Sequence, residues 1–286
     1  MSNEPKGAMH FEGRKSIGAM EAAENQRRWD EKHYQTVNKK PLHWYDITRA
    51  HLNFEVAKGG IIQKMGTSKP VEERFKERLE ELGVKPNPEV KKNDPAAAKM
   101  SNQIVEFVFS GDHEVMNTMA FGNQAVDFER DGTADNSHIQ RMNEIEQWAI
   151  DLYDWMAKKY GEENIIGFDV HLDETTAHCH ATIIPVVMRT EKKTGRERPV
   201  VSYKGLFGKD KATGQEIMKQ LHTELYEQVN SNYGLMRGDP VEISGAQHKD
   251  KVQMYYQLKR ELPTNYLPYQ DSKSNHKPTT TTSLSM

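Results

Sequence analysis

The sequence predicts an α+β fold, a mainly antiparallel sheet with helices packed on one of its faces. Two apolar runs, 165–168 and 181–184, flank a short polar stretch, which is typical of a strand hairpin. Residues 47–56 alternate apolar and polar side chains, as a strand with one buried face does. Apolar side chains at steps of mostly three and four predict helices over 71–82 and 136–160. Strands and amphipathic helices in this order favour one sheet covered by a layer of helices.

Length and composition bound the class of protein. With 286 residues, 36% of them hydrophobic and 28% charged, the chain can build one domain of about 200 residues with extensions. The formal net charge of −3 does not indicate nucleic-acid binding, so a DNA-binding face has to be a local concentration of Lys and Arg. The single cysteine, Cys179, excludes an internal disulfide and fits a reducing cytoplasm. Without an apolar signal segment or a run of about 18 apolar residues, we expect a cytoplasmic protein with no membrane insertion.

Three parts of the chain differ in composition. Residues 1–20 contain three scattered glycines and predict a mobile arm or an irregular start to the fold. Residues 21–245 are expected to form the folded domain. Residues 246–286 are polar and end in a run of Thr and Ser, which predicts a disordered extension.

The elements of the expected domain follow from local patterns. Residues 19–33 are charged and helix-permissive, which is typical of a solvated helix. The amphipathic helix over 71–82 ends at a glycine, and 103–109 reads as the next strand. The apolar stripe of the 136–160 helix belongs to the core, and a last amphipathic helix is predicted over 214–232.

The polar face of the predicted 47–56 strand carries Arg49, His51, Asn53 and Glu55. A polar face is ordinary on a half-exposed strand. The same four side chains in one row would also suit a phosphate and its supporting groups. Both interpretations stay open at this point.

A basic segment lies between residues 189 and 211, where eight basic residues stand against three acidic ones. Such an excess could follow a phosphate backbone, although a solvated loop rich in Lys is equally common. Lys204 lies within this segment.

The most informative stretch is the polar part of the predicted hairpin. It holds His171, Glu174, His178 and His180 within ten residues. Side chains alternate along a strand, so His178 and His180 share a face and Cys179 points away. A lone His-x-His is usually a surface pair, but a further His and Glu across a hairpin favour a metal site. Three neutral imidazoles suit one divalent metal with open positions for a substrate oxygen.

These motifs resemble those of a known family. The pattern His-x-Asp-Glu-x-Thr-x-His-x-His over 171–180 resembles the third motif of the Mob/Pre plasmid mobilization relaxases, the MobV family. The segment 49–55 is similar to that family's Arg-x-His-Leu-Asn-Tyr-Glu. Further similarity lies at 206–208 and 233–238, so the resemblance covers about residues 15–245.

The resemblance implies an HUH relaxase-like fold, with the three-His metal site on the open face of the sheet. It implies a metal-dependent, site- and strand-specific DNA endonuclease. Such enzymes nick one strand at an origin of transfer, stay attached to the 5′ phosphate and later rejoin the ends. The implied cofactor is Mn²⁺ or Mg²⁺, held by His171, His178 and His180. The implied partners are origin DNA, single-stranded or as a hairpin, and a coupling protein of a conjugation system.

By position, the resemblance also implies catalytic roles. Glu174 would be the carboxylate that activates the nucleophile or supports the site, and Asp173 would support it or cap the turn. The family's first motif is His-Asn-x-Arg. Here residues 24–27 correspond to it: Asn25 and Arg27 match the motif, whereas Glu24 departs from it and holds the position of the expected nucleophilic His.

The identity of the nucleophile stays open between several side chains. A carboxylate such as Glu24 can attack phosphorus to give an acyl phosphate, and carboxylates serve as covalent nucleophiles elsewhere. The alternatives are His33, Tyr34 and Tyr45, or a protein that nicks DNA without a covalent link.

Several further residues are expected to contact DNA. Arg27 and Arg49 would clamp phosphate oxygens as bidentate donors. His51, Asn53 and Lys204 complete the expected DNA- and phosphate-binding set.

Two other classes of function remain. An oxygenase could use His178, His180 and Glu174 as a two-His, one-carboxylate site, and dependence on oxygen would reveal it. An origin-binding protein without catalysis would bind DNA but nick it under no divalent metal.

Overall fold

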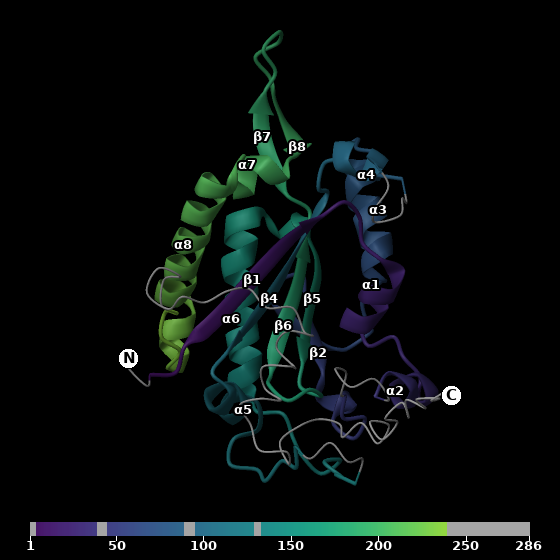
Figure 1. Ribbon diagram of the computed structural model, residues 1–286, viewed down its shortest axis with the longest axis vertical. Helices are drawn as coiled ribbons and strands as arrows, with labels where there is room; N and C mark the ends of the chain where they lie inside the picture. Colours follow the sequence, from purple (N-terminus) through teal and green to yellow (C-terminus); the bar gives the residue numbers. More distant parts are fainter. Residues whose placement is uncertain (1–3, 39–44, 89–94, 129–132, 239–286) are drawn as a thin grey trace, which may run out of the picture.

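A six-stranded sheet forms the centre of the molecule (Figure 1). The computed structural model describes residues 4–38, 45–88, 95–128 and 133–238. In sheet order the strands are β1 (Gly7–Arg14), β4 (Ile104–Gly111), β6 (His178–Ile183), β5 (Ile165–His171), β2 (Phe54–Ala57) and β3 (Ile61–Lys64). Every neighbouring pair is antiparallel, which confirms the predicted fold class.

Three helices cover one face of the sheet: α5 (His113–Phe121), α6 (Asn143–Tyr160) and α8 (Lys211–Gln228). Their apolar side chains form the main core with strand residues such as Phe107 and Phe168, which are about 1% exposed or less. The stripe predicted over 136–160 belongs to this core, although the helix itself begins seven residues later. The predicted last helix is α8, followed by a short 3₁₀ helix (Asn230–Tyr233).

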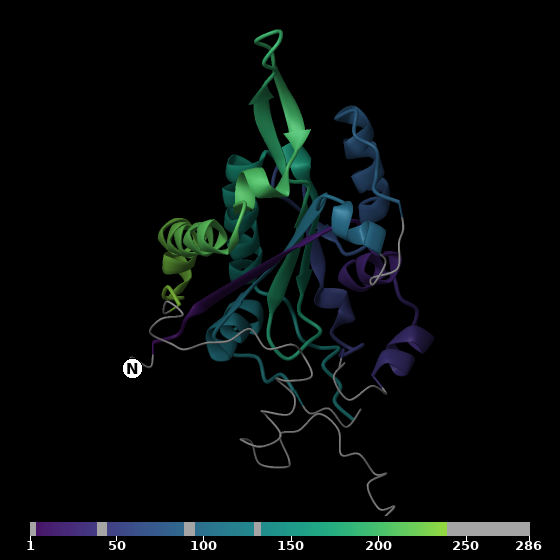
Figure 2. The same cartoon turned by 45° about the horizontal axis from the view of Figure 1, so that its top comes forward.

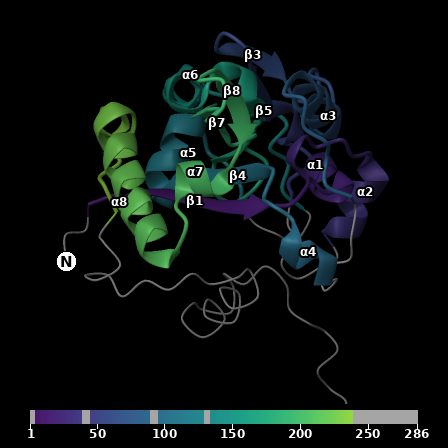
Figure 3. The same ribbon diagram turned by 90° about the horizontal axis from the view of Figure 1, so that it is seen from above.

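The other face of the sheet is also partly covered, which the prediction of a single helical layer did not include. Helices α1 (Ala19–Asn25) and α3 (Val71–Glu81) pack there through a second cluster that includes Ala22, Phe75 and Ile166. Figure 3 shows the sheet between these helices and the group of α5, α6 and α8. The end of this face near the β5–β6 turn carries the histidines.

The N-terminal arm predicted for residues 1–20 differs in the structure, because Gly7–Arg14 forms edge strand β1. It pairs with β4 over the whole length, from Gly7 opposite Gly111 to Arg14 opposite Ile104. Met9 and Phe11 face the core, so the alternation was present but obscured by glycines. At Gly13 the glycine permits a close approach: a Cβ would lie 2.3 Å from the Tyr203 ring.

The strand predicted over 47–56 is shorter than expected. Only Phe54–Ala57 is a strand, and Ala50–Leu52 forms a 3₁₀ turn. The charged helix predicted over 19–33 is divided into α1 and α2 (Glu31–Val37). The break lies at Arg27, which has a φ of +47° in the left-handed region.

A second hairpin continues beyond the end of the main sheet. Strands β7 (Val186–Thr190) and β8 (Glu197–Val201), with the loop between them, carry five of the eight basic residues of the basic segment, and α7 (Tyr203–Phe207) follows them (Figures 1 and 2). A short helix, α4 (Pro95–Lys99), precedes β4. No helix within the described ranges has the length and apolar character that crossing a membrane requires. The predicted disordered extension, 246–286, lies outside the described residues.

Candidate metal centre

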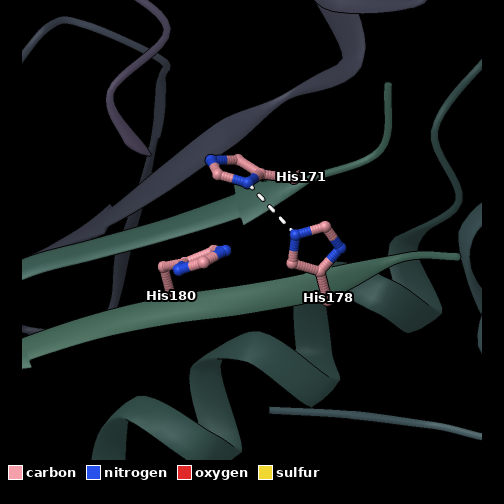
Figure 4. A group of neighbouring side chains, drawn as sticks. All are labelled: His171, His178 and His180. Atoms are coloured by element: carbon pink, nitrogen blue, oxygen red, sulfur yellow. Dashed lines mark hydrogen bonds between the residues drawn. The ribbon is translucent and has the colours of Figure 1, made fainter. Parts of the chain in front are cut away.

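Three histidines meet at the end of the β5–β6 hairpin. In the strand register His171 lies opposite His178, and Asp169 opposite His180. The side-chain alternation predicted from the sequence is therefore confirmed. One nitrogen from each ring lies within 4.8 Å of the other two (Figure 4). Three imidazoles at this spacing can bind one metal ion.

Hydrogen bonds orient two of the rings. The Nε2–H of His171 donates to the Asn25 carbonyl at 2.6 Å, and the Nδ1–H of His178 donates to the Thr176 carbonyl at 2.8 Å. The other nitrogens, Nδ1 of His171 and Nε2 of His178, therefore face each other at 3.3 Å with their lone pairs. Two ligands that each lie about 2.1 Å from one metal are separated by about this distance. The donor set fits a divalent ion.

The protonation state of His171 suits the same role. Burial lowers the pKa of His171 well below its usual value, and the nearby Arg27 lowers it further. A neutral imidazole keeps the lone pair that a metal needs.

Glu174 lies beside the histidines. Its Oε1 is 3.5 Å from Nε2 of His178 and 3.8 Å from Nδ1 of His171. The side chain is 28% exposed, so solvent and a substrate can reach it. The structure thus brings Glu174 to the mouth of the site, where the sequence placed it.

Arg27 forms its hydrogen bonds with other residues of the protein. Its Nε and Nη2 donate to the two oxygens of Asp173 at 2.9 Å, and Nη2 also donates to Glu174 at 2.7 Å. The guanidinium lies 4.6 Å from the centre of the Tyr45 ring, and Asp173 is completely buried. The expected phosphate clamp is therefore a clamp on the hairpin turn.

Arg49 differs from expectation in the same way. It is 2% exposed and donates to Asp46, to the Leu172 carbonyl at 2.6 Å and to the Glu174 carbonyl at 3.1 Å. Asn53 accepts a hydrogen bond from the Leu172 amide at 2.6 Å. Both residues fix the course of the hairpin turn and are turned away from solvent, because the 3₁₀ turn removes them from the sheet face.

The other two expected DNA contacts are exposed: His51 on the 3₁₀ turn and Lys204 on α7. Helix α7 lies at the opposite end of the sheet from the β5–β6 turn, so Lys204 is far from the three histidines (Figure 1).

The nucleophile candidates gather on α1 and the segment after it. Glu24 is partly exposed, and its Oε1 accepts a hydrogen bond from the Tyr45 hydroxyl at 2.6 Å. The next residue, Asn25, is the one whose carbonyl contacts His171. Tyr34 and Tyr45 are buried, and burial raises the pKa of both phenols well above the usual value. His33 is exposed on α2 and stacks on Trp29.

Supporting residues that the sequence did not reveal lie on α5. The Asn117 side chain donates to the Thr175 carbonyl at 2.9 Å and accepts from the Ala177 amide at 3.2 Å. These bonds hold the turn between the two halves of the metal motif. A polar residue on an amphipathic helix carries no sequence signal for such a contact.

Two buried carboxylates, Glu55 and Asp169, lie on the same sheet face as the histidines. Glu55 lies opposite Asp169 in the register, and Asp169 lies opposite His180. Burial raises the pKa of Asp169 to about 7, and Arg74 opposes that rise. One oxygen of each carboxylate has no hydrogen-bond partner among the described residues.

Known sequences match part of the chain. The family model described as "Plasmid recombination enzyme" (Mob_Pre) matches residues 123–257, which include the histidine motif. Plasmid recombination enzyme type 1 of Staphylococcus aureus is 30% identical over 107 residues, which are 37% of this chain and 23% of that protein. Type 3 of the same organism is 26% identical over 131 residues, 44% of this chain and 27% of that protein. The chain spans about a quarter of the length of these relatives.

Solved structures share the fold. A MobM relaxase domain (MOBV; Mob_Pre), Mn-bound and in complex with plasmid pMV158 oriT DNA of 22 nucleotides, covers 90% of this chain and is itself covered completely. Its TM-score is 0.53 at 20% identity. The same domain with DNA of 23 nucleotides gives 0.52 at 18% identity, with 89% and 98% coverage. The resemblance to the Mob/Pre family is thus confirmed: the family model matches residues 123–257, and the fold is similar to that of the MobM relaxase domain.

Proposed function

We propose that this protein is a plasmid mobilization relaxase. It nicks one DNA strand at an origin of transfer by metal-dependent transesterification, remains attached to the 5′ phosphate and later rejoins the strand. One observation carries the proposal: the two imidazole nitrogens that face each other at 3.3 Å, with Glu174 beside them. The relatives named as plasmid recombination enzymes and the oriT-bound relaxase domains support it.

The metal ligands in this proposal are His171, His178 and His180. We favour Mn²⁺ over Mg²⁺, since Mg²⁺ prefers oxygen ligands and the similar relaxase domains are Mn-bound. When bound, the ion withdraws electrons from a phosphate oxygen and offsets charge in the transition state. The protein's part is to hold three neutral imidazoles on two strands and to keep Glu174 at the mouth of the site.

For the nucleophile we propose Glu24. Its carboxylate is partly exposed and is oriented by the Tyr45 hydroxyl, one residue from the carbonyl that contacts His171. Tyr34 and Tyr45 are disfavoured because both side chains are buried, which keeps their hydroxyls away from a phosphate. His33 stacks on Trp29 on a separate helix.

The covalent step conserves bonds and charge. An oxygen of Glu24 forms a bond to phosphorus while the bond from phosphorus to the 3′ oxygen breaks. A proton taken up by the 3′ oxygen gives a free 3′ hydroxyl, and the 5′ phosphate remains on the protein as an acyl phosphate. Rejoining is the reverse attack by a 3′ hydroxyl. Glu174, whose carboxylate accepts a hydrogen bond from Arg27 at 2.7 Å, is placed to support the site and to accept a proton there as general base, and the proton for the 3′ oxygen comes from solvent.

We also propose the cytoplasm as the place of action and a coupling protein of a conjugation system as a partner. The buried thiol of Cys179, whose pKa is raised by burial, fits a reducing compartment.

The test is a nicking assay on a supercoiled plasmid that carries the protein's own origin. We expect nicking with Mn²⁺ and none with chelator. His178→Ala should abolish the nick, while His138→Ala, which removes an exposed histidine in a loop, should retain it. Protease digestion and mass mapping of the nucleotide-linked peptide should identify Glu24.

Each other outcome contradicts a defined part of the proposal. An adduct on His33 or Tyr34 would mean that the first motif is aligned wrongly. Binding without a nick under any divalent metal would favour a non-catalytic origin-binding protein. Activity that needs oxygen and no DNA would favour a two-His, one-carboxylate oxygenase.

A further inference from the structure

The two carboxylate oxygens of Glu24 have different surroundings. Oε1 accepts a hydrogen bond from the Tyr45 hydroxyl at 2.6 Å, and the Tyr45 side chain is only 2% exposed. No described residue donates a hydrogen bond to Oε2 of Glu24, and the side chain as a whole is partly exposed. Oε1 is therefore the inner, anchored oxygen, and Oε2 is the oxygen left to attack a phosphate.

A bond from Oε2 to phosphorus makes Glu24 an acyl phosphate. In this mixed anhydride Oε1 becomes the carbonyl oxygen, and a nucleophile can attack either phosphorus or the Cδ atom of Glu24. A phosphorylated His or Tyr side chain, in contrast, offers phosphorus alone. Rejoining uses phosphorus, where the 3′ hydroxyl attacks, so Cδ is the centre that is open to water.

The Tyr45 hydroxyl is placed to favour attack at Cδ. Water that adds to Cδ leaves negative charge on Oε1, and a donor already fixed beside that oxygen stabilises this charge. Burial, the nearby Glu174 and the hydrogen bond to Glu24 raise the pKa of Tyr45, so the phenol keeps its proton and remains a donor.

A general base belongs to the same network. Arg27 donates from Nη1 to the Glu24 backbone carbonyl and from Nη2 to the Glu174 carboxylate, both at 2.7 Å. One guanidinium thus ties Glu174 to the residue that carries the acyl phosphate. The Glu174 side chain is 28% exposed, so water reaches it, and its carboxylate can accept the proton that an attacking water loses.

We propose a second activity for this site: hydrolysis of its own covalent intermediate by attack of water at Cδ of Glu24. The water oxygen bonds to Cδ while Glu174 takes one proton, and the bond from Cδ to the bridging oxygen then breaks. The DNA leaves with a 5′ phosphate that keeps this bridging oxygen. Glu24 regains a carboxylate with one oxygen from water, and the second proton of the water goes to solvent.

This activity rests on the proposed relaxase function with Glu24 as the nucleophile. It makes the attachment to DNA temporary, because a protein whose DNA end is not rejoined is released by water. Rejoining and release then compete for one intermediate, at phosphorus and at carbon.

The experiment follows the isolated adduct in water enriched in ¹⁸O. Wild type nicks an origin oligonucleotide with Mn²⁺ in ordinary water, and gel filtration removes the short strand with the 3′ hydroxyl, so that rejoining cannot occur. After transfer to ¹⁸O water, we expect the released 5′ phosphate to carry no label. The tryptic peptide 16–27 should gain one ¹⁸O, which fragmentation assigns to Glu24. Label in the DNA phosphate instead would place the attack at phosphorus and overturn the proposal.

Tyr45→Phe removes only the hydroxyl that donates to Oε1. Its adduct should survive at least about tenfold longer than that of wild type, because the charge on Oε1 loses its donor. Tyr34→Phe is the matched control: it removes the same atom from the neighbouring buried ring, and its adduct should survive as long as that of wild type. Lifetimes are measured on adduct already formed, so slower nicking does not affect the comparison. Equal lifetimes for Tyr45→Phe and wild type would contradict the proposal.

Failure of the relaxase proposal is distinguishable from failure of this one. No nick, or an adduct on another residue, overturns the catalytic assignment and the hydrolysis with it. An adduct on Glu24 that does not release DNA, or that releases labelled phosphate, overturns the hydrolysis at Cδ alone. Hydroxylamine identifies the Glu24 adduct independently, because it should convert an acyl phosphate to a hydroxamate at that residue.

Discussion

Arg27 joins the N-terminal segment to the metal hairpin through two hydrogen bonds to Asp173 and one to Glu174. Its side chain is 3% exposed and that of Asp173 is not exposed at all. Because neither buried charge is hydrated, the guanidinium and the carboxylate each need the other as counter-charge.

Removing Arg27 should therefore destabilise the fold strongly. We expect Arg27→Ala to lower the free energy of unfolding by about 3–5 kcal/mol, because Asp173 is left buried without a counter-charge. Urea denaturation measures the change. Arg28→Ala is the matched control: Arg28 pairs with Glu72 at the surface, and such pairs contribute about 0–1 kcal/mol. Equal losses in the two variants would contradict the assigned role of Arg27.

Glu106 offers a pH-dependent prediction. Burial, together with Glu21, raises the pKa of Glu106 from 4.5 to about 7, although Arg14 opposes the rise. Between these pH values the folded chain binds more protons than the unfolded chain, so stability should fall as pH rises from about 4.5 to 7.

Glu106→Gln should flatten that slope, with a gain over wild type of up to about 3 kcal/mol at pH 7. Unfolding followed from pH 4.5 to 8 tests it. Glu114→Gln, at an exposed position on α5, should leave the slope unchanged. A variant of Glu106 that keeps the wild-type pH slope would show that the carboxyl is ionised in the fold.

At the scale of elements, strand β1 depends on one glycine. A Cβ at Gly13 would lie 2.3 Å from the Tyr203 ring, which α7 holds against Phe207. We expect Gly13→Ala to destabilise by about 1–3 kcal/mol through overpacking. Gly18→Ala, whose Cβ would have its nearest neighbour at 4.0 Å, meets no crowding; because Gly18 is the N-cap of α1, it should cost about 0.5–1 kcal/mol.

The double variant Gly13→Ala with Tyr203→Ala separates crowding from loss of backbone freedom. If crowding is the cause, Gly13→Ala should cost less in the Tyr203→Ala background than in wild type. Equal costs in both backgrounds would assign the effect to the backbone of the strand or to Asn102, whose Nδ2 would lie 2.5 Å from the same Cβ.

Helices and strands were predictable from the sequence where one hydrophobic periodicity dominates the segment. The β5–β6 hairpin and helix α3 follow clear periods of two and of three to four, and both are confirmed. The prediction of a strand over 47–56 was wrong up to residue 53, because Arg49 is drawn into the interior by Asp46 and two carbonyls. That bonding depends on a turn more than 100 residues away, which no local pattern contains.

The site was predictable to the same extent. The three histidines lie on one hairpin, so strand alternation brought them together correctly. The roles expected for Arg27 and Arg49 required knowledge of their partners, and both partners lie on the distant turn. The sequence gives the charge of Arg27 and Arg49, but only the fold shows that the turn around residues 172–174 provides hydrogen-bond acceptors for both.

For the molecule as a whole, metal binding should stabilise the native state. An ion that binds the folded chain alone raises the free energy of unfolding by about 2.7 kcal/mol at 100 times its Kd. We expect Mn²⁺ to raise the melting temperature and chelator to reverse it. His178→Ala should abolish the effect and His138→Ala should keep it. An identical response from both variants would place the ion elsewhere.

The hydrogen bond from His171 to the Asn25 carbonyl spans 146 residues of chain. It sets which nitrogen of His171 is free, so the ring is prepared for a metal only after the N-terminal segment has docked. During synthesis the N-terminal segment with Asn25 is made before the β5–β6 hairpin with His171, so this hydrogen bond can form only after the hairpin has been synthesised. Metal binding would therefore require that the N-terminal segment has docked on the hairpin, and a chain without that contact would hold the ion less well.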